Sequence, residues 1–187
     1  MLGSPLPAAG ARAPAGLTLL ELLVTLAVAA ILTALATPSF HDLLVANRMA
    51  VRVNALATHL NLARAEAVRR DRQVVLCRST DGAGCAGVGP WGGGWLMFLD
   101  VNHNEARDPG EPVLRVHGPL GGGLTLDYSG FPSGAYLAFH GTGTASGNGT
   151  FTFCDARGAA AAKAVIVSRT GRLRLSRRQA DGSPLVC

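Results

Sequence analysis

The first strong pattern along the chain is an apolar run at residues 17–36. Glu21 is its only charged residue, and three threonines are its only other polar side chains. As a helix that rises ~1.5 Å per residue, such a run extends about 30 Å, which is enough to cross the apolar core of a bilayer. The pattern therefore predicts a membrane-spanning helix at residues 17–37. A charge inside it is costly to bury, so Glu21 is a candidate functional residue.

A second helical pattern begins at Pro38, which lacks an amide donor and is expected to interrupt or kink the first helix. Between residues 38 and 72, apolar side chains recur at alternating spacings of four and three, which places them on one face of an amphipathic helix. That face is expected to pack onto the part of the chain that follows. Its residues are Met49, Val53, Leu56, Leu60, Ala63 and Ala67.

The remaining residues, 73–187, have the pattern of a β-rich region. Short segments rich in valine, leucine and aromatic residues alternate with glycine-dense loops. Because a long helix precedes them, the predicted fold class is α+β, with the helix packed on one or more antiparallel sheets. We expect Trp95 in the core and Trp91 in a loop. The predicted strands are residues 73–78, 94–99, 112–117, 124–128, 135–140, 150–154, 164–168 and 172–177.

All four cysteines lie beyond the apolar run, which indicates disulfides formed in an oxidising compartment. Three pairings are possible. We favour Cys77–Cys85, because it would bracket a glycine-rich loop, and Cys154–Cys187, because it would clasp the end of the chain. No Cys-x-x-Cys spacing or Cys/His cluster indicates zinc, and no cofactor is expected.

A short leader ends in glycine just before the apolar run, and an acid follows five residues later. The segment is Gly16-Leu17-Thr18-Leu19-Leu20-Glu21, and it resembles a type IV prepilin signal. The resemblance implies a leader at residues 1–16 and cleavage by a prepilin peptidase between Gly16 and Leu17. It also implies that Glu21 pairs with the new N-terminus of a neighbouring subunit. The alternative is a secretory signal peptide, whose apolar region is usually only ~7–15 residues long.

Three further segments extend this resemblance. They are Leu62-Ala63-Arg64-Ala65-Glu66-Ala67, Gly94-Trp95-Leu96-Met97-Phe98 and Val165-Ile166-Val167-Ser168. They resemble the FimT/GspH family of minor type IV pilins and type II secretion pseudopilins. The resemblance implies a type IV pilin-like fold, with a transmembrane or filament-core helix at 17–37, an amphipathic helix at 38–72 and a periplasmic region at 73–187. It implies an inner-membrane precursor that crosses once, later assembled into a pilus or pseudopilus with other pilins or pseudopilins. No catalytic pattern indicates an enzyme.

Near the end of the chain, arginine and leucine alternate. With the two-residue period of a strand, Arg172 and Arg174 face one side, ~6.6–6.8 Å apart, and Leu173 and Leu175 face the other. Planar guanidinium groups at this spacing suit a row of phosphates. The alternative is a solvated basic face on an edge strand, where charge also blocks aggregation. The spacing alone leaves both interpretations open.

The segment Gly171-Arg172-Leu173-Arg174 also resembles the Gly-Arg-x-Arg element with which FimT-like minor pilins bind DNA. The resemblance implies a FimT-like minor pilin that binds double-stranded DNA without sequence preference during DNA uptake in natural transformation. The alternative is a GspH-like pseudopilin of type II secretion, an assembly subunit that binds no DNA. No aromatic residue interleaves with the arginines, so base stacking is not expected. Charge is expected to be added by Arg169, Arg177, Arg178 and Lys163.

An oxygen-rich loop between two predicted strands matches positions 1, 3, 5, 9 and 12 of a calcium-binding loop. However, Glu105 stands where such loops have a glycine for their sharp turn. Asn and Asp side chains also stabilise loops without a metal, because they bond their own backbone. We favour no metal, with calcium as the less favoured alternative. Its candidate ligands are Asp100, Asn102, Asn104, Asp108 and Glu111.

Overall fold

The structure is a computed structural model that describes residues 16–187, apart from the side chains of residues 35–39 and 41. The predicted leader at 1–16 therefore lies outside the described residues, except for Gly16. The chain forms two compact units, Met1–Leu44 and Val45–Cys187, and each is described by itself.

Helix α1 (Leu19–Arg70) is the only α-helix in the described part of the chain. The sequence predicted an interruption or a kink at Pro38, and the structure has one uninterrupted helix there. The proline removes one backbone hydrogen bond, and the helical turns before and after it remain continuous. The helix also ends two residues before the predicted boundary at residue 72. Among the residues that the structure describes, no helix combines the length and the apolar character needed to cross a membrane.

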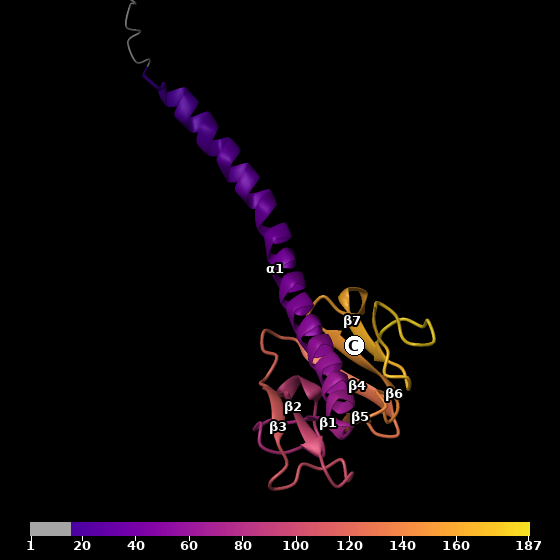
Figure 1. Cartoon of the computed structure of the whole chain (residues 1–187). Coiled ribbons are helices and arrows are strands. Elements are labelled where there is room, and N and C mark those ends of the chain that lie inside the picture. The colour runs from indigo at the N-terminus through magenta and orange to yellow at the C-terminus, as the bar shows by residue number, and fades with distance from the viewer. Residues whose placement is uncertain (1–15) are drawn as a thin grey trace, which may run out of the picture. The chain divides into compact units, whose positions relative to one another are not determined.

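The apolar face predicted on the second half of α1 is confirmed, because all six of its residues are buried. They form one core with side chains from both sheets of the second unit. Figure 1 shows this part of the helix lying across the strands. Every buried apolar side chain among the described residues lies between Met49 and Leu185, and both disulfides lie between Cys77 and Cys187. The unit Val45–Cys187 therefore contains a complete core.

The strands form two four-stranded antiparallel sheets. Sheet A has the order β3-β2-β1-β5, and sheet B has the order β4-β6-β7-β8. Because β5 joins sheet A while its neighbours β4 and β6 join sheet B, the chain crosses between the sheets twice in this region. The strands of sheet A are β1 (Gln73–Arg78), β2 (Trp95–Asp100), β3 (Val113–His117) and β5 (Tyr136–Phe139). Those of sheet B are β4 (Thr125–Phe131), β6 (Asn148–Cys154), β7 (Lys163–Val167) and β8 (Leu173–Ser176).

Both tryptophans are buried in the core. Trp95 is buried in β2, as predicted. Trp91 was predicted to lie in a loop, but it is buried in the short helix η1 (Trp91–Gly93) and stacks edge-on against Phe151 of sheet B, with ring centroids 5.0 Å apart. Its indole nitrogen donates to the carbonyl oxygen of Gly134 at 2.9 Å, so the polar atom of this large side chain has a partner.

Each sheet has an inner face toward α1 and an outer face that part of the chain covers. On sheet A, the Cys77–Cys85 disulfide holds the loop after β1 against an outer apolar cluster. On sheet B, the Cys154–Cys187 disulfide holds the end of the chain, and Leu185 packs on the outer face. We call these two segments the sheet A cover (residues 79–90) and the sheet B cover (residues 177–187). The favoured disulfide pairing is confirmed.

Candidate functional site

A tight turn places the start of β8. The amide of Gly171 donates to the carbonyl oxygen of Ser168 at 2.8 Å. Gly171 has φ of +76°, and a Cβ atom there would lie 2.2 Å from the carbonyl oxygen of Gly143. A side chain at this position would be strained by the backbone conformation and would collide with a neighbouring turn. The glycine of the Gly-Arg-x-Arg segment is therefore a structural requirement.

One guanidinium from helix α1 fixes the same turn. The Nε atom of Arg64 donates to the carbonyl oxygen of Gly143 at 2.9 Å, and Nη2 donates to that of Thr170 at 3.3 Å. Arg64 thereby satisfies carbonyl groups of two turns that are distant in sequence, one after β5 and one before β8. A hydrogen bond from a charged guanidinium to a carbonyl oxygen is stronger than one between two neutral groups.

Arg172 and Arg174 both lie on the outer face of sheet B. Arg174 is directly paired with Ile166 of β7, and paired residues of antiparallel strands share a face. Arg172 is two positions earlier and so lies on the same side. Both are exposed. Neither side chain makes a hydrogen bond or an ion pair within residues 16–187, so both guanidinium groups are available to a ligand.

The other basic residues predicted for this site are placed differently. Arg169 is exposed in the turn before β8, and its side chain makes no hydrogen bond or ion pair to the described residues. Arg177 lines a cavity with Ala50 and Leu175, on the side of sheet B that faces α1. Arg178 donates to the carbonyl oxygen of Gly182 at 3.0 Å, within the sheet B cover. The structure thus groups Arg172 and Arg174 and sets Arg177 and Arg178 apart from them.

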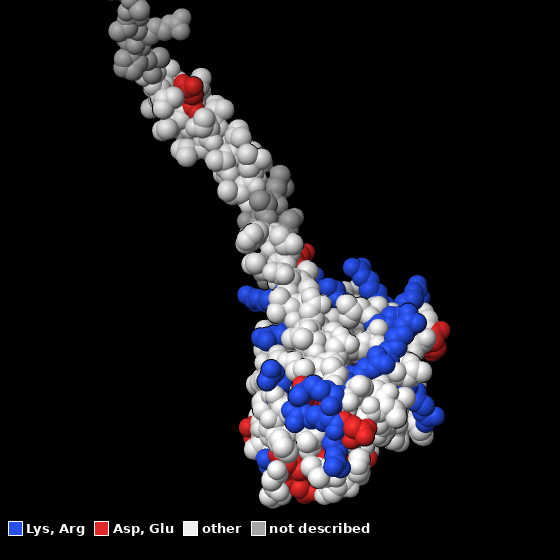
Figure 2. Space-filling model, viewed as in Figure 1, with Lys and Arg blue, Asp and Glu red and all other residues white. Residues whose placement is uncertain are grey.

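Basic side chains are unevenly distributed over the second unit. On the face seen in Figure 2, they gather in a band over the part of the unit that contains β7 and the end of the chain, with few acidic side chains inside the band. An uncompensated group of positive charges raises the local concentration of anionic partners.

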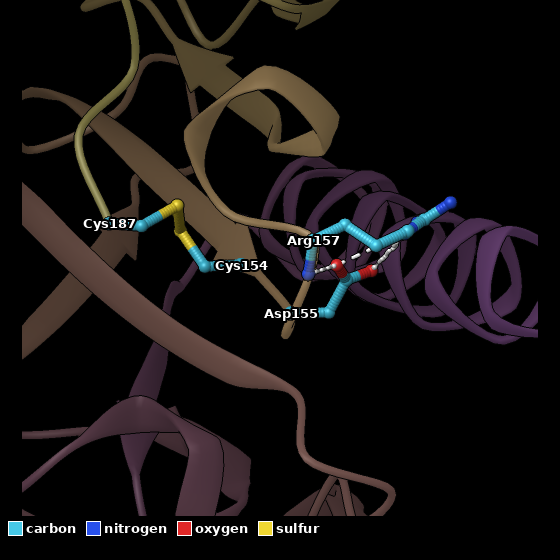
Figure 3. A network of polar contacts seen from close by, with 4 residues as sticks. All are labelled: Cys154, Asp155, Arg157 and Cys187. Atoms are coloured by element: carbon cyan, nitrogen blue, oxygen red, sulfur yellow. Dashed lines mark hydrogen bonds and ion pairs between the residues drawn. A yellow bond between two sulfur atoms is a disulfide. The ribbon is translucent and has the colours of Figure 1, made fainter. Parts of the chain in front are cut away.

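The arginine near the second disulfide, unlike Arg172 and Arg174, is paired with a carboxylate. Arg157 forms an ion pair with Asp155 at 2.7 Å, next to the Cys154–Cys187 disulfide (Figure 3). Hydrogen bonds from this guanidinium hold the pKa of the Asp155 carboxyl below its ordinary value. The pair closes the turn after β6 and has no charge left to offer a phosphate, unlike Arg172 and Arg174.

The predicted cleavage site lies at the start of the described chain. Gly16 and Leu17 are exposed, and a Cβ atom at Gly16 would meet nothing within 4 Å. The fold therefore does not require glycine there. Helix α1 is capped by Thr18, whose hydroxyl accepts the amide of Glu21 at 3.2 Å. The carboxyl group of Glu21 consequently lies in the first turn of the helix, where the helix dipole favours negative charge.

The candidate calcium loop is closed by its own hydrogen bonds. Buried Asp100 accepts the amides of His103 and Glu105 at 2.7 and 3.0 Å. The side-chain amides of Asn102 and Asn104 donate to Asp108, which lowers the pKa of its carboxyl. Glu111 likewise accepts backbone amides with both oxygens. Within the described residues, no group of three or more His, Cys, Asp or Glu side chains could hold a metal ion.

One aromatic side chain on the same sheet face as the arginines was not predicted from the sequence. The predicted strand ended at residue 128, whereas β4 extends to Phe131. Phe131 is 65% exposed, and the alternation along β4 places it on the outer face of sheet B. The alternation of polar residues at 125, 127 and 129 was the sequence signal that could have revealed it, because it places residue 131 on the same face.

Comparisons with known proteins identify the family. The family model described as type II transport protein GspH matches residues 52–171, and the prokaryotic N-terminal methylation motif matches residues 12–37. The chain belongs to the GspH family. It is therefore a minor pilin or pseudopilin, a structural subunit of a type IV pilus or of a type II secretion system, with the processing signal of such subunits.

Individual relatives agree with this assignment. Pilin-like protein PilA1 of Thermus thermophilus is 42% identical over 104 residues, which are 54% of this chain and 58% of that protein. The chain thus matches less than two thirds of this relative's length. Two crystal forms of the Pseudomonas aeruginosa type IV minor pilin FimU have the same fold. One has a TM-score of 0.56 at 23% identity and covers 75% of this chain and 96% of FimU. The other has a TM-score of 0.51 at 24% identity, with 74% and 97% covered.

Proposed function

We propose that this GspH-family protein is a minor type IV pilin that binds double-stranded DNA through Arg172 and Arg174. The observation that carries the proposal is that both guanidinium groups lie on one exposed face and have no partner within the described chain. Guanidinium groups bind phosphate oxygens through two parallel hydrogen bonds, and neighbours on one face of a strand lie at a spacing that suits successive phosphates.

Contacts of this kind do not depend on base sequence. Each phosphate neutralised on a duplex releases counterions, so affinity falls steeply as salt concentration rises. The turn that Gly171 and Arg64 fix sets the direction of the two arginines before DNA arrives. This preorganisation reduces the entropy lost on binding. In a filament, such a subunit would capture DNA at the start of uptake.

The double substitution Arg172→Gln and Arg174→Gln tests the proposal. Fluorescence anisotropy would follow a labelled duplex titrated with the full chain in a nonionic detergent. Because two phosphate contacts are lost, we expect binding at least tenfold weaker at about 50 mM salt, and a slope of log affinity against log salt smaller by about 1.8.

A matched control removes the same charge elsewhere. The substitution of Arg48 and Arg52 by glutamine takes two positive charges from helix α1 and is expected to change affinity much less. Equal losses of duplex affinity in both variants would mean that only the net charge of the protein matters. An unchanged affinity in the Arg172/Arg174 variant would refute the proposal.

A second candidate is favoured by the family description itself, which names type II transport. In that case the protein is a pseudopilin of the secretion system, and its basic face is solvated or covered by a neighbouring subunit. Secretion of a reporter substrate separates the two candidates. A strain that lacks the protein would lose secretion under this second candidate and DNA uptake under the first.

We also propose that a prepilin peptidase cleaves the chain between Gly16 and Leu17. Exposure of this bond and the absence of any structural need for glycine at position 16 support the proposal. Glu21 would then lie near the new N-terminus and pair with the terminal amine of a neighbouring subunit, so that two charges are neutralised together. Mass spectrometry of the chain recovered from cells with an active peptidase tests the cleavage site.

A further inference from the structure

A groove crosses the outer face of sheet B beside the two arginines. It has a volume of about 460 Å³. Ser129, Thr150 and Ile166 lie along its floor, and Phe131, Asn148 and Ala180 also line it. We call it the outer-face groove. Ala180 belongs to the sheet B cover, so the groove lies beside the covered part of the sheet.

The strand register connects this groove to Arg174. Ser129 of β4 pairs with Thr150 of β6, which pairs with Ile166 of β7, which pairs with Arg174 of β8. These four residues form one row across all the strands of sheet B, on one face. Three strand spacings of ~4.8 Å put the ends of the row roughly 14 Å apart. The row therefore leads from the arginine edge directly along the floor of the groove.

Polar side chains in the groove are available to a ligand. The hydroxyls of Ser129 and Thr150 and the amide of Asn148 make no hydrogen bond to any described residue. Amide and hydroxyl groups can donate to and accept from the edges of bases and the oxygens of sugars.

The two ends of the groove differ in character. At the β4 end, Phe131 is 65% exposed and offers an aromatic ring. The other end of the groove lies at β7, and beyond it, on the neighbouring strand β8, Arg172 and Arg174 offer unpaired positive charge. Exposed Asp127, on the same face of β4 as Ser129, repels phosphate from the β4 end. An occupant of this groove would thus have its anionic part near β8 and an apolar ring near β4.

We propose that the outer-face groove binds a segment of single-stranded DNA. Arg172 and Arg174 contact its phosphates, and the ring of Phe131 stacks on one of its bases. The inference rests on the proposed DNA binding and extends it to a second form of the ligand. A duplex keeps its bases stacked on one another, so it reaches the arginines but leaves Phe131 unused. An unpaired strand has free base faces, and stacking on an aromatic ring tolerates any base.

Two substitutions at Phe131 test this inference with the full chain in nonionic detergent. Phe131→Leu removes the ring, and Phe131→Tyr keeps it. Anisotropy titrations would use a labelled oligothymidylate and a labelled duplex. We expect Phe131→Leu to weaken oligothymidylate binding roughly tenfold, given the worth of one base stacked on an aromatic ring, and to leave duplex binding unchanged. Phe131→Tyr should restore binding of the single strand.

Failure of the inference is distinguishable from failure of the proposed function. If Phe131→Leu binds oligothymidylate as tightly as the original chain does, the groove does not hold the strand, whatever the duplex does. If Phe131→Leu weakens duplex and single strand equally, no stacking on an unpaired base is involved, and the inference is again wrong. If the Arg172/Arg174 variant keeps full duplex affinity while Phe131→Leu no longer binds the single strand, the proposed duplex binding is wrong. Binding of single-stranded DNA in the outer-face groove is then still supported. Thermal unfolding of each variant verifies that it is folded.

Discussion

Both sheets carry a disulfide-linked cover on the outer face, but the arginine at the edge of the sheet A cover and the two on strand β8 differ in whether they have a partner. On sheet A, the guanidinium of Arg78, the last residue of β1, donates to carbonyl oxygens of the cover: those of Ala86 and Gly89 at 2.9 and 2.8 Å, and that of Gly87. Its charge is committed to holding the loop. On sheet B, the cover leaves a groove open, and Arg172 and Arg174 have no partner within the described chain. Both disulfides thus hold a cover on a sheet, and on sheet B that cover lies beside the face that we propose to bind DNA.

The largest expected effect is the loss of stability when the disulfide that holds each cover is removed. The Cys154–Cys187 disulfide closes a sequence separation of 33 residues and the Cys77–Cys85 disulfide one of 8. The loop-entropy relation then gives a loss of about 4 kcal/mol for Cys154→Ser with Cys187→Ser, against about 2.5 kcal/mol for Cys77→Ser with Cys85→Ser. Urea unfolding of the unit Val45–Cys187 measures both. Equal losses would mean that the sheet B cover stabilises the unit no more than the sheet A cover does.

A smaller effect separates the two kinds of arginine. Arg78→Gln removes hydrogen bonds from a charged donor to the cover, so the free energy of unfolding should fall by about 1.5–3 kcal/mol. Arg174→Gln removes no hydrogen bond or ion pair to the described residues, so the free energy of unfolding should change by no more than about 0.5 kcal/mol. DNA affinity should fall in Arg174→Gln and stay nearly unchanged in Arg78→Gln. Urea unfolding and anisotropy on the same two variants provide the test, and a stability loss in Arg174→Gln would contradict the contrast.

The smallest effect is a pH dependence at the contact between helix α1 and sheet A. Trp95 donates to Nδ1 of His59 at 2.9 Å and stacks on His117, with centroids 3.9 Å apart. Burial lowers the pKa of both imidazoles from 6.5, and for His59 the charges on His117 and Arg115 lower it further. The unfolded chain therefore takes up protons first as the pH falls. The stability that the neutral imidazoles provide is complete above pH 6.5 and is lost below it.

The strands of sheet B contain no histidine, so mild acid should loosen sheet A first. Amide hydrogen exchange at about pH 7.5 and 5.5 measures this within the range where histidine titrates. The carboxyl groups with lowered pKa titrate below this range and do not interfere. The glutamine of His59→Gln can still accept a hydrogen bond from Trp95 but does not titrate, so this variant should show a smaller change in exchange between the two pH values. An unchanged pH response in the variant would mean that groups other than His59 cause it.

Local pattern predicted the elements well. The helical stripe from Met49 to Ala67 and the alternation at Arg172 and Arg174 depend on neighbours in sequence, and both hold in the structure. The disulfide partners could also be chosen, because each pair brackets a loop or an end of the chain. Family motifs supplied the pilin-like fold, which residue pattern alone could not have distinguished from other α+β arrangements.

Long-range pairing is what the sequence could not supply. The division into two sheets depends on β5 leaving its neighbours in sequence, which no periodicity records. Trp91 was misplaced because its glycine-rich surroundings resemble a loop, although a short helical turn buries its ring. Phe131 reaches the arginine face only through the register of four strands. Which arginines remain unpaired also depends on carbonyl groups that folding brings near, as at Arg64 and Arg78.

The bridge made by Arg64 has a mechanical consequence. Its guanidinium joins helix α1 to the turn that leads into β8, and to a second turn at Gly143. A displacement of the helix along its axis would therefore move the turn before Arg172 through this side chain, in addition to the apolar core that the helix shares with both sheets. If the filament bears tension through its helices, the angle at which Arg172 and Arg174 project would respond to the pull, and the proposed DNA contact would respond with it.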